Sequence, residues 1–256
     1  MTIEATAALI IIGNEVLSGR TRDANLPFLA SELSQIGIRL REVRVIPDVE
    51  QTIIDTVNSL RAQFRYVFTT GGIGPTHDDI TSGSVAKAFG VALERNPEAV
   101  ARLQRVIKPE NLNAARLRMA DIPHGATLID NPVSQAPGFI LGNVYVMAGV
   151  PKIMQAMFLG IRDSLEGGAP VQSAGVTVWT GEGAIAADLQ AVQERFPSID
   201  LGSYPFRQAN GQPSTVLVGR GSDSAAVAAA IQAIRDFLTR DGIAFSEGDL
   251  SPTGEN

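Results

Sequence analysis

The sequence predicts an α/β protein, with a doubly wound, mostly parallel sheet followed by a small βαββα module. Apolar runs such as residues 5–12 are typical of strands buried on both faces, as in parallel sheets. Segments with apolar residues at helical spacing follow these runs, and this alternation of strands and helices indicates a doubly wound sheet. The chain has 256 residues, of which 45% are hydrophobic, so it can bury a substantial core.

In the first half of the chain, predicted strands and helices alternate. The first helix carries Leu26, Leu29 and Leu33 on one face, and Asp23 is its expected N-cap. The expected elements are a strand over 5–12, a polar loop over 13–22, a helix over 23–37, a strand over 38–46, a helix over 53–64 and a strand over 66–70.

In the second half, a helix follows Thr81, and a helical pair over 97–119 is expected to break near Pro109. Strands around 139–141 and 144–147 are joined by Gly142-Asn143, a hairpin signal, and Pro151 opens another helix. The module that follows is predicted as a strand over 176–179, a helix over 184–196, strands over 199–205 and 215–218, and a helix over 225–238.

The strongest domain boundary is Gly167-Gly168-Ala169-Pro170, because two glycines and a proline interrupt both helices and strands. We expect a first domain over 1–169, the small module over 170–242, and a disordered tail over 243–256, which is rich in Ser, Pro, Gly and acidic residues.

Composition excludes several classes of protein. The net charge of −6 and the absence of a basic run interleaved with aromatics argue against nucleic-acid binding. The chain has no cysteine, which excludes disulfides, zinc–thiolate sites and thiol nucleophiles. The uncharged run 131–151 contains prolines and glycines that a membrane span would not carry, and the N-terminus lacks the basic start of a signal peptide. We therefore expect a soluble, cytoplasmic protein with no membrane partner.

Three segments should meet at one edge of the sheet. Ligands of open parallel sheets bind beyond the carboxyl ends of the strands. The segments that follow the first three predicted strands are Gly13–Arg22, Pro47-Asp48 and Gly71–Thr81.

The loop Gly71-Gly72-Ile73-Gly74 directly follows a buried strand. Three glycines in four positions let backbone amides point at one spot, and the next helix adds a partial positive charge, so the loop is suited to phosphate. The alternative is a tight turn that only needs positive φ.

Asp78 and Asp79 follow this loop, and Asp48 lies on the neighbouring one. One aspartate could cap the next helix, but two adjacent carboxylates repel each other unless a cation is shared between them. A divalent cation that bridges carboxylates and phosphate oxygens would explain the pair. Asp48 could equally cap its own helix, and Glu15 could be a solvated loop residue. His77 could be a loop donor near the ligand or a plain exposed histidine.

The segment Gly181-Glu182-Gly183-Ala184-Ile185-Ala186 matches the G-x-G-x-x-A dinucleotide pattern, which is weak by itself. The module is only about half of a dinucleotide-binding domain, and Asp200 falls near the start of the next strand rather than at its end. We interpret these glycines as sites of close helix–strand packing.

Taken together, five segments resemble the molybdopterin-binding (MoaB/Mog-like) domain, in the version found in CinA-like competence/damage-inducible proteins. The similarity covers residues 5–170, and the rest resembles the module that follows in CinA. The amidase domain of CinA is not expected in this chain. The segments are Gly13-Asn14-Glu15-Val16-Leu17-Ser18-Gly19, Val45-Ile46-Pro47-Asp48, the loop from Gly71 to Thr81, Asn131-Pro132 through Ala136-Pro137-Gly138, and Ala148-Gly149-Val150-Pro151.

The resemblance implies a ligand with a phosphate or pyrophosphate, bound over the glycine loop with a divalent metal (Mg, Mn or Co). It implies Asp48 and Asp79 as catalytic residues, and Asp48, Asp78 and Asp79 as metal ligands. Mog-like members usually have arginine at the position of Asp78, which favours the CinA-like activity over molybdopterin adenylylation. The expected ligand-binding residues are Gly13, Asn14, Glu15, Ser18, Gly19, Gly71, Gly72, Gly74, Pro75, Thr76, Thr81, Ser134, Gly149 and Pro151.

These expectations leave two alternative functions. The first is a metal-dependent pyrophosphatase acting on a compound such as ADP-ribose or FAD. The second is a non-catalytic protein that binds molybdopterin or a nucleotide for storage, delivery or regulation. Both have a small nucleotide or pterin as partner, and the resemblance also implies a homo-oligomer, dimeric or trimeric.

Overall fold

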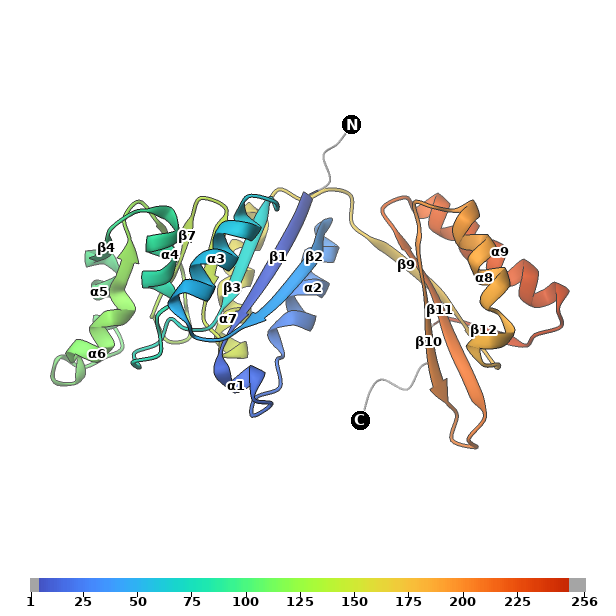
Figure 1. Cartoon of the computed structure of the whole chain (residues 1–256), viewed down its shortest axis with the longest axis horizontal. Helices are drawn as coiled ribbons and strands as arrows, with labels where there is room; N and C mark the ends of the chain where they lie inside the picture. Colours follow the sequence, from blue (N-terminus) through green and yellow to red (C-terminus); the bar gives the residue numbers. More distant parts are fainter. Residues whose placement is uncertain (1–4, 249–256) are drawn as a thin grey trace. The chain divides into compact units, whose positions relative to one another are not determined.

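The computed structural model describes residues 5–248, and the chain divides into two compact units, Met1–Gly168 and Ala169–Asn256. Figure 1 shows their elements, and each unit is described by itself.

The first unit is built on a six-stranded sheet of order β2-β1-β3-β8-β7-β6. Strand β1 pairs in parallel with β2 and β3, and β3 pairs in parallel with β8. The last two strands run antiparallel to their neighbours, so β6 points in the same direction as β8. The strands are β1 (Ala5–Ile12), β2 (Ile38–Ile46), β3 (Tyr66–Thr70), β6 (Thr127–Ile129), β7 (Gly138–Leu141) and β8 (Val144–Met147).

Helices cover both faces of this sheet, as predicted for a doubly wound fold (Figure 1). Successive residues of β1 alternate between the two cores: Ile10 packs with α3 and α4, whereas Leu9 packs with α2 and α7. The helices are α2 (Asn25–Gln35), α3 (Glu50–Arg61), α4 (Thr81–Phe89) and α7 (Pro151–Ile161).

Individual polar residues and glycines determine where some helices begin and where strands turn. The N-cap of α2 is Ala24 and not Asp23 as predicted, but Asp23, one residue earlier, accepts a hydrogen bond from the first-turn amide of Leu26 (2.8 Å). The β7–β8 hairpin forms at Gly142-Asn143, and the Asn143 side chain donates to the carbonyl oxygens of Arg61 and Phe64.

The segment between α4 and β7 contains shorter helices and more strands than predicted. The helical pair over 97–119 is α5 (Pro97–Gln104) followed by short turns, because Pro109 interrupts the backbone hydrogen bonds. Three strands here, β4, β5 and β6, were not predicted, since each has only three residues and pairs with a partner outside its own local sequence. The turns are η1 (Pro109–Asn111), α6 (Ala114–Leu117) and η2 (Arg118–Ala120), and the first two strands are β4 (Leu93–Arg95) and β5 (Asp121–Pro123).

The second unit is a four-stranded antiparallel sheet of order β10-β11-β9-β12, with α8 and α9 packed on it. Its element order, βαββαβ, is the split-βαβ arrangement of ferredoxin-like folds. The elements are β9 (Gln172–Val178), η4 (Glu182–Ala184), α8 (Ala186–Arg195), β10 (Asp200–Arg207), β11 (Pro213–Gly221), α9 (Ser224–Arg240) and β12 (Phe245–Glu247).

Strand β12 corrects the prediction of a disordered tail over 243–256. Residues 245–247 pair with β9, and Phe245 packs against the core beneath α8 and α9. A three-residue edge strand has no periodicity of its own, and its pairing partner lies far away in the sequence. Residues 249–256 of the predicted tail lie outside the described residues.

The interpretation of Gly181 and Gly183 as packing glycines is wrong. A Cβ added at Gly183 would meet nothing within 4 Å, and one at Gly181 would make only an ordinary contact with Pro213 (3.8 Å). Among residues 5–248, no helix is long and apolar enough to span a bilayer.

We predict that Phe245→Ala lowers the unfolding free energy of the second unit by about 1–3 kcal/mol, because it removes a half-buried ring from the core. Trp179 is the only tryptophan, and its amide donates to the Ala244 carbonyl beside β12, so denaturant unfolding followed by its fluorescence reports on this unit. Ser246→Ala, in the same strand, serves as the control and should shift the midpoint little. Equal midpoints for Phe245→Ala and the unmodified protein would contradict a structural role for β12.

Candidate functional site

The glycine loop after β3 is compressed against the neighbouring strands. Gly71 has φ +104°, and a Cβ there would lie 2.1 Å from the carbonyl oxygen of Ile12, at the end of β1. Gly72 has φ +68°, and its Cβ would lie 2.1 Å from the hydroxyl of Thr81. Both positions require glycine, for backbone conformation and for space.

Thr81, the first residue of α4, fixes the helix to this loop. Its amide donates to the Gly72 carbonyl (3.0 Å), and its hydroxyl donates to the Gly71 carbonyl (3.0 Å). The Thr81 side chain is fully buried, so its role is to position the loop.

Three consecutive amides of the loop are free to bind an anion. No acceptor within residues 5–248 takes a hydrogen bond from the backbone amides of Gly72, Ile73 or Gly74. These residues are half-buried, so the amides lie close to solvent without being paired. Successive unpaired amides in a turn form a concave site for negative charge.

Asp79 holds the far end of this loop. Its Oδ2 accepts hydrogen bonds from the amide (2.8 Å) and the hydroxyl (2.5 Å) of Thr76, and it lies 2.7 Å from where a Cβ of Gly74 would be. The Thr76 hydroxyl also lies close enough to Asp78 to lower the pKa of that carboxyl, and the Asp78 amide lowers it further. The His77 side chain is 95% exposed.

The loop after β1, residues 13–22, is the first loop of the site. It is held by hydrogen bonds within itself and with Asp48. Asp48 Oδ2 accepts from the amide of Asn14 (2.9 Å), at the start of the short helix α1 (Asn14–Leu17). The Glu15 carboxylate folds back over Gly13, so its oxygens lie 2.4 and 2.6 Å from the position of a Cβ there. Ser18 donates to the Glu15 carbonyl (3.2 Å), and Gly19 closes the turn through its amide.

A cavity of about 520 Å³ opens at this edge of the sheet. The loop after β6 reaches it too, because β6 ends on the same side as β8. The lining combines apolar side chains, among them Met119, Val150 and Ile153, with the carboxylates of Glu15 and Asp79. The lining is Glu15, Thr21, Ile73, Gly74, Pro75, Asp79, Met119, Asn131, Ser134, Ala136, Ala148, Gly149, Val150, Pro151 and Ile153.

The structure brings part of the predicted site together. Seven predicted residues line the cavity: Glu15, Gly74, Pro75, Asp79, Ser134, Gly149 and Pro151. The others lie around it or shape its loops, and their ligand contacts remain predictions: Gly13, Asn14, Ser18, Gly19, Asp48, Gly71, Gly72, Thr76, Asp78 and Thr81.

Some residues of the site carry no sequence signal. Asn25, at the start of α2, is 4% exposed and donates to the Gly149 carbonyl (2.8 Å), 124 positions away. Gly149 in turn packs on Gly71, since a Cβ at Gly149 would lie 3.2 Å from the Gly71 Cα. Met119 looks like an ordinary helix residue in the sequence. Only the Asn131 motif, whose side chain accepts from the amides of Val133 and Ser134, could have been recognised as a turn.

The acidic residues do not form a metal centre by themselves. Within residues 5–248, no group of three or more His, Asp or Glu side chains could hold a metal ion. Asp48 and Asp78 are absent from the cavity lining, where the two carboxylates are those of Glu15 and Asp79. Mg²⁺ is commonly held by one or two carboxylates together with substrate phosphates. The residues present therefore fit a divalent ion that is held jointly with a phosphate ligand.

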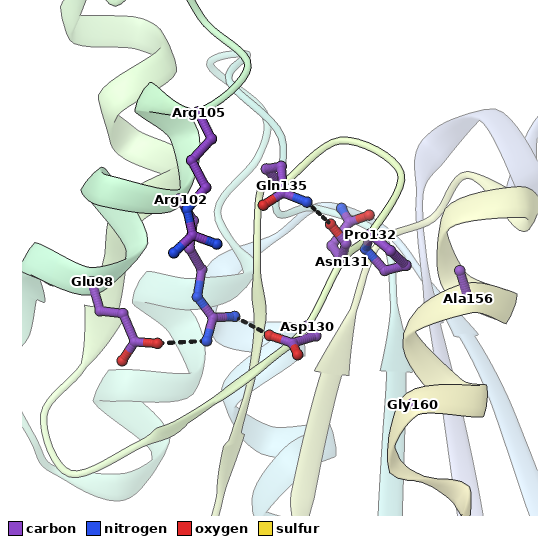
Figure 2. A pocket seen from close by; sticks show the side chains of 9 residues that line it. All are labelled: Glu98, Arg102, Arg105, Asp130, Asn131, Pro132, Gln135, Ala156 and Gly160. Atoms are coloured by element: carbon purple, nitrogen blue, oxygen red, sulfur yellow. Dashed lines mark hydrogen bonds and ion pairs between the residues drawn. The ribbon is translucent and has the colours of Figure 1, made fainter.

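A second cavity, of about 490 Å³, lies between α5, the loop after β6 and α7. Figure 2 shows Arg102 bridging Glu98 (2.6 Å) and Asp130 (2.5 Å) across it. The positive charge of Arg102 is thus neutralised by its neighbours.

Comparisons with known proteins agree with this architecture. A family model described as a probable molybdopterin binding domain matches residues 8–166, and one described as the FAD synthase middle domain matches residues 170–247. A protein from Archaeoglobus fulgidus is 32% identical over 231 residues, 90% of this chain and 96% of that protein.

CinA-like proteins are also similar. The CinA-like protein of Citrifermentans bemidjiense is 36% identical over 156 residues, 59% of this chain but only 38% of that protein. The crystal structure of the protein CinA from Thermoplasma acidophilum superimposes with a TM-score of 0.60 at 33% identity, covering 63% of this chain and 99% of that one. The resemblance and fold class predicted from the sequence are confirmed, and the chain belongs to the molybdopterin-binding (MoaB/Mog-like) domain family.

Proposed function

We propose that this protein is a metal-dependent pyrophosphatase that hydrolyses a nucleotide joined through a pyrophosphate, such as ADP-ribose or FAD. The observation that carries the proposal is the set of free amides of Gly72, Ile73 and Gly74, at the edge of a cavity that also holds two carboxylates. The match of the second unit to the FAD synthase middle domain supports a nucleotide ligand.

Each kind of lining residue suits one part of such a ligand. The apolar side chains of Met119, Val150 and Ile153 can cover the flat face of a base or pterin and exclude water from it. The amides of the glycine loop can donate to phosphate oxygens and stabilise negative charge that develops there. Ser134 and Asn131 add uncharged polar groups to the lining.

Glu15 and Asp79 would hold a divalent ion together with the phosphates. The ion would polarise the phosphoryl group and lower the pKa of a bound water. Water adds to one phosphorus as the P–O anhydride bond breaks, giving two phosphate products. The hydrogen bonds from Thr76 hold Asp79 against Gly74, which keeps this carboxylate beside the phosphate-binding amides.

A second candidate, a protein that binds a nucleotide or molybdopterin without turnover, also has an observation in its favour. Asp48 accepts a hydrogen bond from the first loop and Asp79 from the glycine loop, so both have structural roles independent of catalysis. Binding requires the cavity and the free amides but no positioned water.

Incubation of the purified protein with Mg²⁺, Mn²⁺ or Co²⁺ and each of ADP-ribose, FAD, NADH and CoA should release a mononucleotide, measured by chromatography. If no substrate is cleaved with any ion, while nucleotides bind saturably in calorimetry, the pyrophosphatase proposal fails and the binding function stands.

For any substrate that is cleaved, Glu15→Gln should lower kcat/KM by about 10- to 100-fold or more, because it removes one of the two carboxylates of the cavity. Glu50→Gln is the matched control: Glu50 is exposed, pairs with Lys87 and is absent from the cavity lining, so activity should be unchanged. Wild-type activity in Glu15→Gln would remove this residue from the mechanism.

Asp79→Asn should also lower kcat/KM, again by about 10- to 100-fold. The amide oxygen of asparagine can still accept from Thr76, so the glycine loop should keep its shape. A thermal midpoint close to that of the unmodified protein would show that the loss is chemical, whereas a large drop in the midpoint would attribute it to the loop.

A further inference from the structure

A third cavity, of about 510 Å³, lies beside the proposed site and is lined by no acidic residue. Lys108 and Arg116 are its two charged side chains, and Asn111 and Ser134 its other polar ones. Val106, Ile107, Met119 and Ala136 complete the lining.

The two cations are not neutralised by the protein. Within residues 5–248, neither Lys108 nor Arg116 forms an ion pair with a carboxylate. The guanidinium of Arg116 donates to the Asn111 carbonyl (2.8 Å), an uncharged acceptor that does not cancel its charge. This differs from the cavity in Figure 2, where Arg102 lies between Glu98 and Asp130.

The segment that supplies these cations is basic within an acidic protein. Residues 102–118 contain five Arg or Lys and one Glu, a net charge of +4, whereas the whole chain carries −6. Glu110, the single acid of this segment, is absent from the lining of the cavity. Such a concentration of uncompensated positive charge attracts anionic ligands.

The cavity adjoins the proposed site. Met119, Ser134 and Ala136 line both, so the two cavities share a border. In addition, Arg118 donates to the Pro75 carbonyl (2.6 Å), which ties the basic segment to the glycine loop.

We propose that this third cavity binds a second anionic group of the same ligand, a phosphomonoester on the nucleoside ribose. A phosphomonoester offers up to two negative charges and three acceptor oxygens, which suit an ammonium and a guanidinium together. The proposal rests on nucleotide binding at the first cavity. It adds a substrate class: pyrophosphate-linked nucleotides with a further phosphate, in preference to their dephosphorylated forms.

The test is calorimetric binding of AMP, adenosine 2′,5′-bisphosphate and adenosine 3′,5′-bisphosphate to the full chain, which needs no turnover. At least one bisphosphate should bind about tenfold more tightly than AMP or better, and the difference should shrink as salt is raised. The paired substrates NADPH with NADH, and CoA with dephospho-CoA, should show the same preference in kcat/KM where they are cleaved.

Lys108→Gln and Arg116→Gln should each reduce the preference, and the double variant should bring the bisphosphates to within about twofold of AMP. Both residues are exposed, so these variants should fold, and their affinity for AMP, which lacks the second phosphate, should fall less than their affinity for the bisphosphates. Arg105→Gln is the matched control, because Arg105 is an exposed cation of the same segment that lines the cavity of Figure 2 and not this one.

Three results would overturn the inference. Equal affinity for AMP and both bisphosphates would refute it while leaving the proposed function intact. A preference that survives in the double variant would place the second phosphate elsewhere. If none of the three nucleotides binds, the proposal that the first cavity binds a nucleotide is wrong. This inference rests on that proposal and would then be wrong too.

Discussion

The close approach of the glycine loop to the ends of β1 and β8 is the constraint on which the site depends. Gly71 leaves no space for a side chain against the Ile12 carbonyl, and Gly149 packs on the Gly71 Cα. Thr81 then fixes the loop to the start of α4 with two hydrogen bonds. The turn is held from both sides, while the amides of the next three residues have no partner within residues 5–248, and it is on this arrangement that the proposed phosphate site rests.

Acidic and basic side chains line two neighbouring cavities. The carboxylates of Glu15 and Asp79 come from the loops after β1 and β3, while the cations come from the segment 102–118. Met119, Ser134 and Ala136 line both cavities, so the acidic lining and the basic lining share a border. This division explains how an acidic protein can offer a site for an anion: the positive charge is local, and its own acidic residues do not neutralise it.

The two carboxylates of the cavity are constrained to different degrees. Asp79 is held by the amide and the hydroxyl of Thr76, whereas Glu15 lies over Gly13 in the exposed first loop. Asp48 does not reach the cavity and instead supports the first loop through the amide of Asn14.

The sequence by itself determined the doubly wound sheet, the extents of β1, β2 and β3, and the position of the glycine loop, since these depend on apolar periodicity and on glycine at strand ends. It also indicated Asp79 and the resemblance to the family. Only the tertiary structure decided that Glu15 and Asp79 line one cavity that Asp48 does not line, that Asn25 contacts Gly149, and that β12 completes the second sheet. These are contacts between residues far apart in the chain, and local patterns carry no record of which distant side chain folding will bring near.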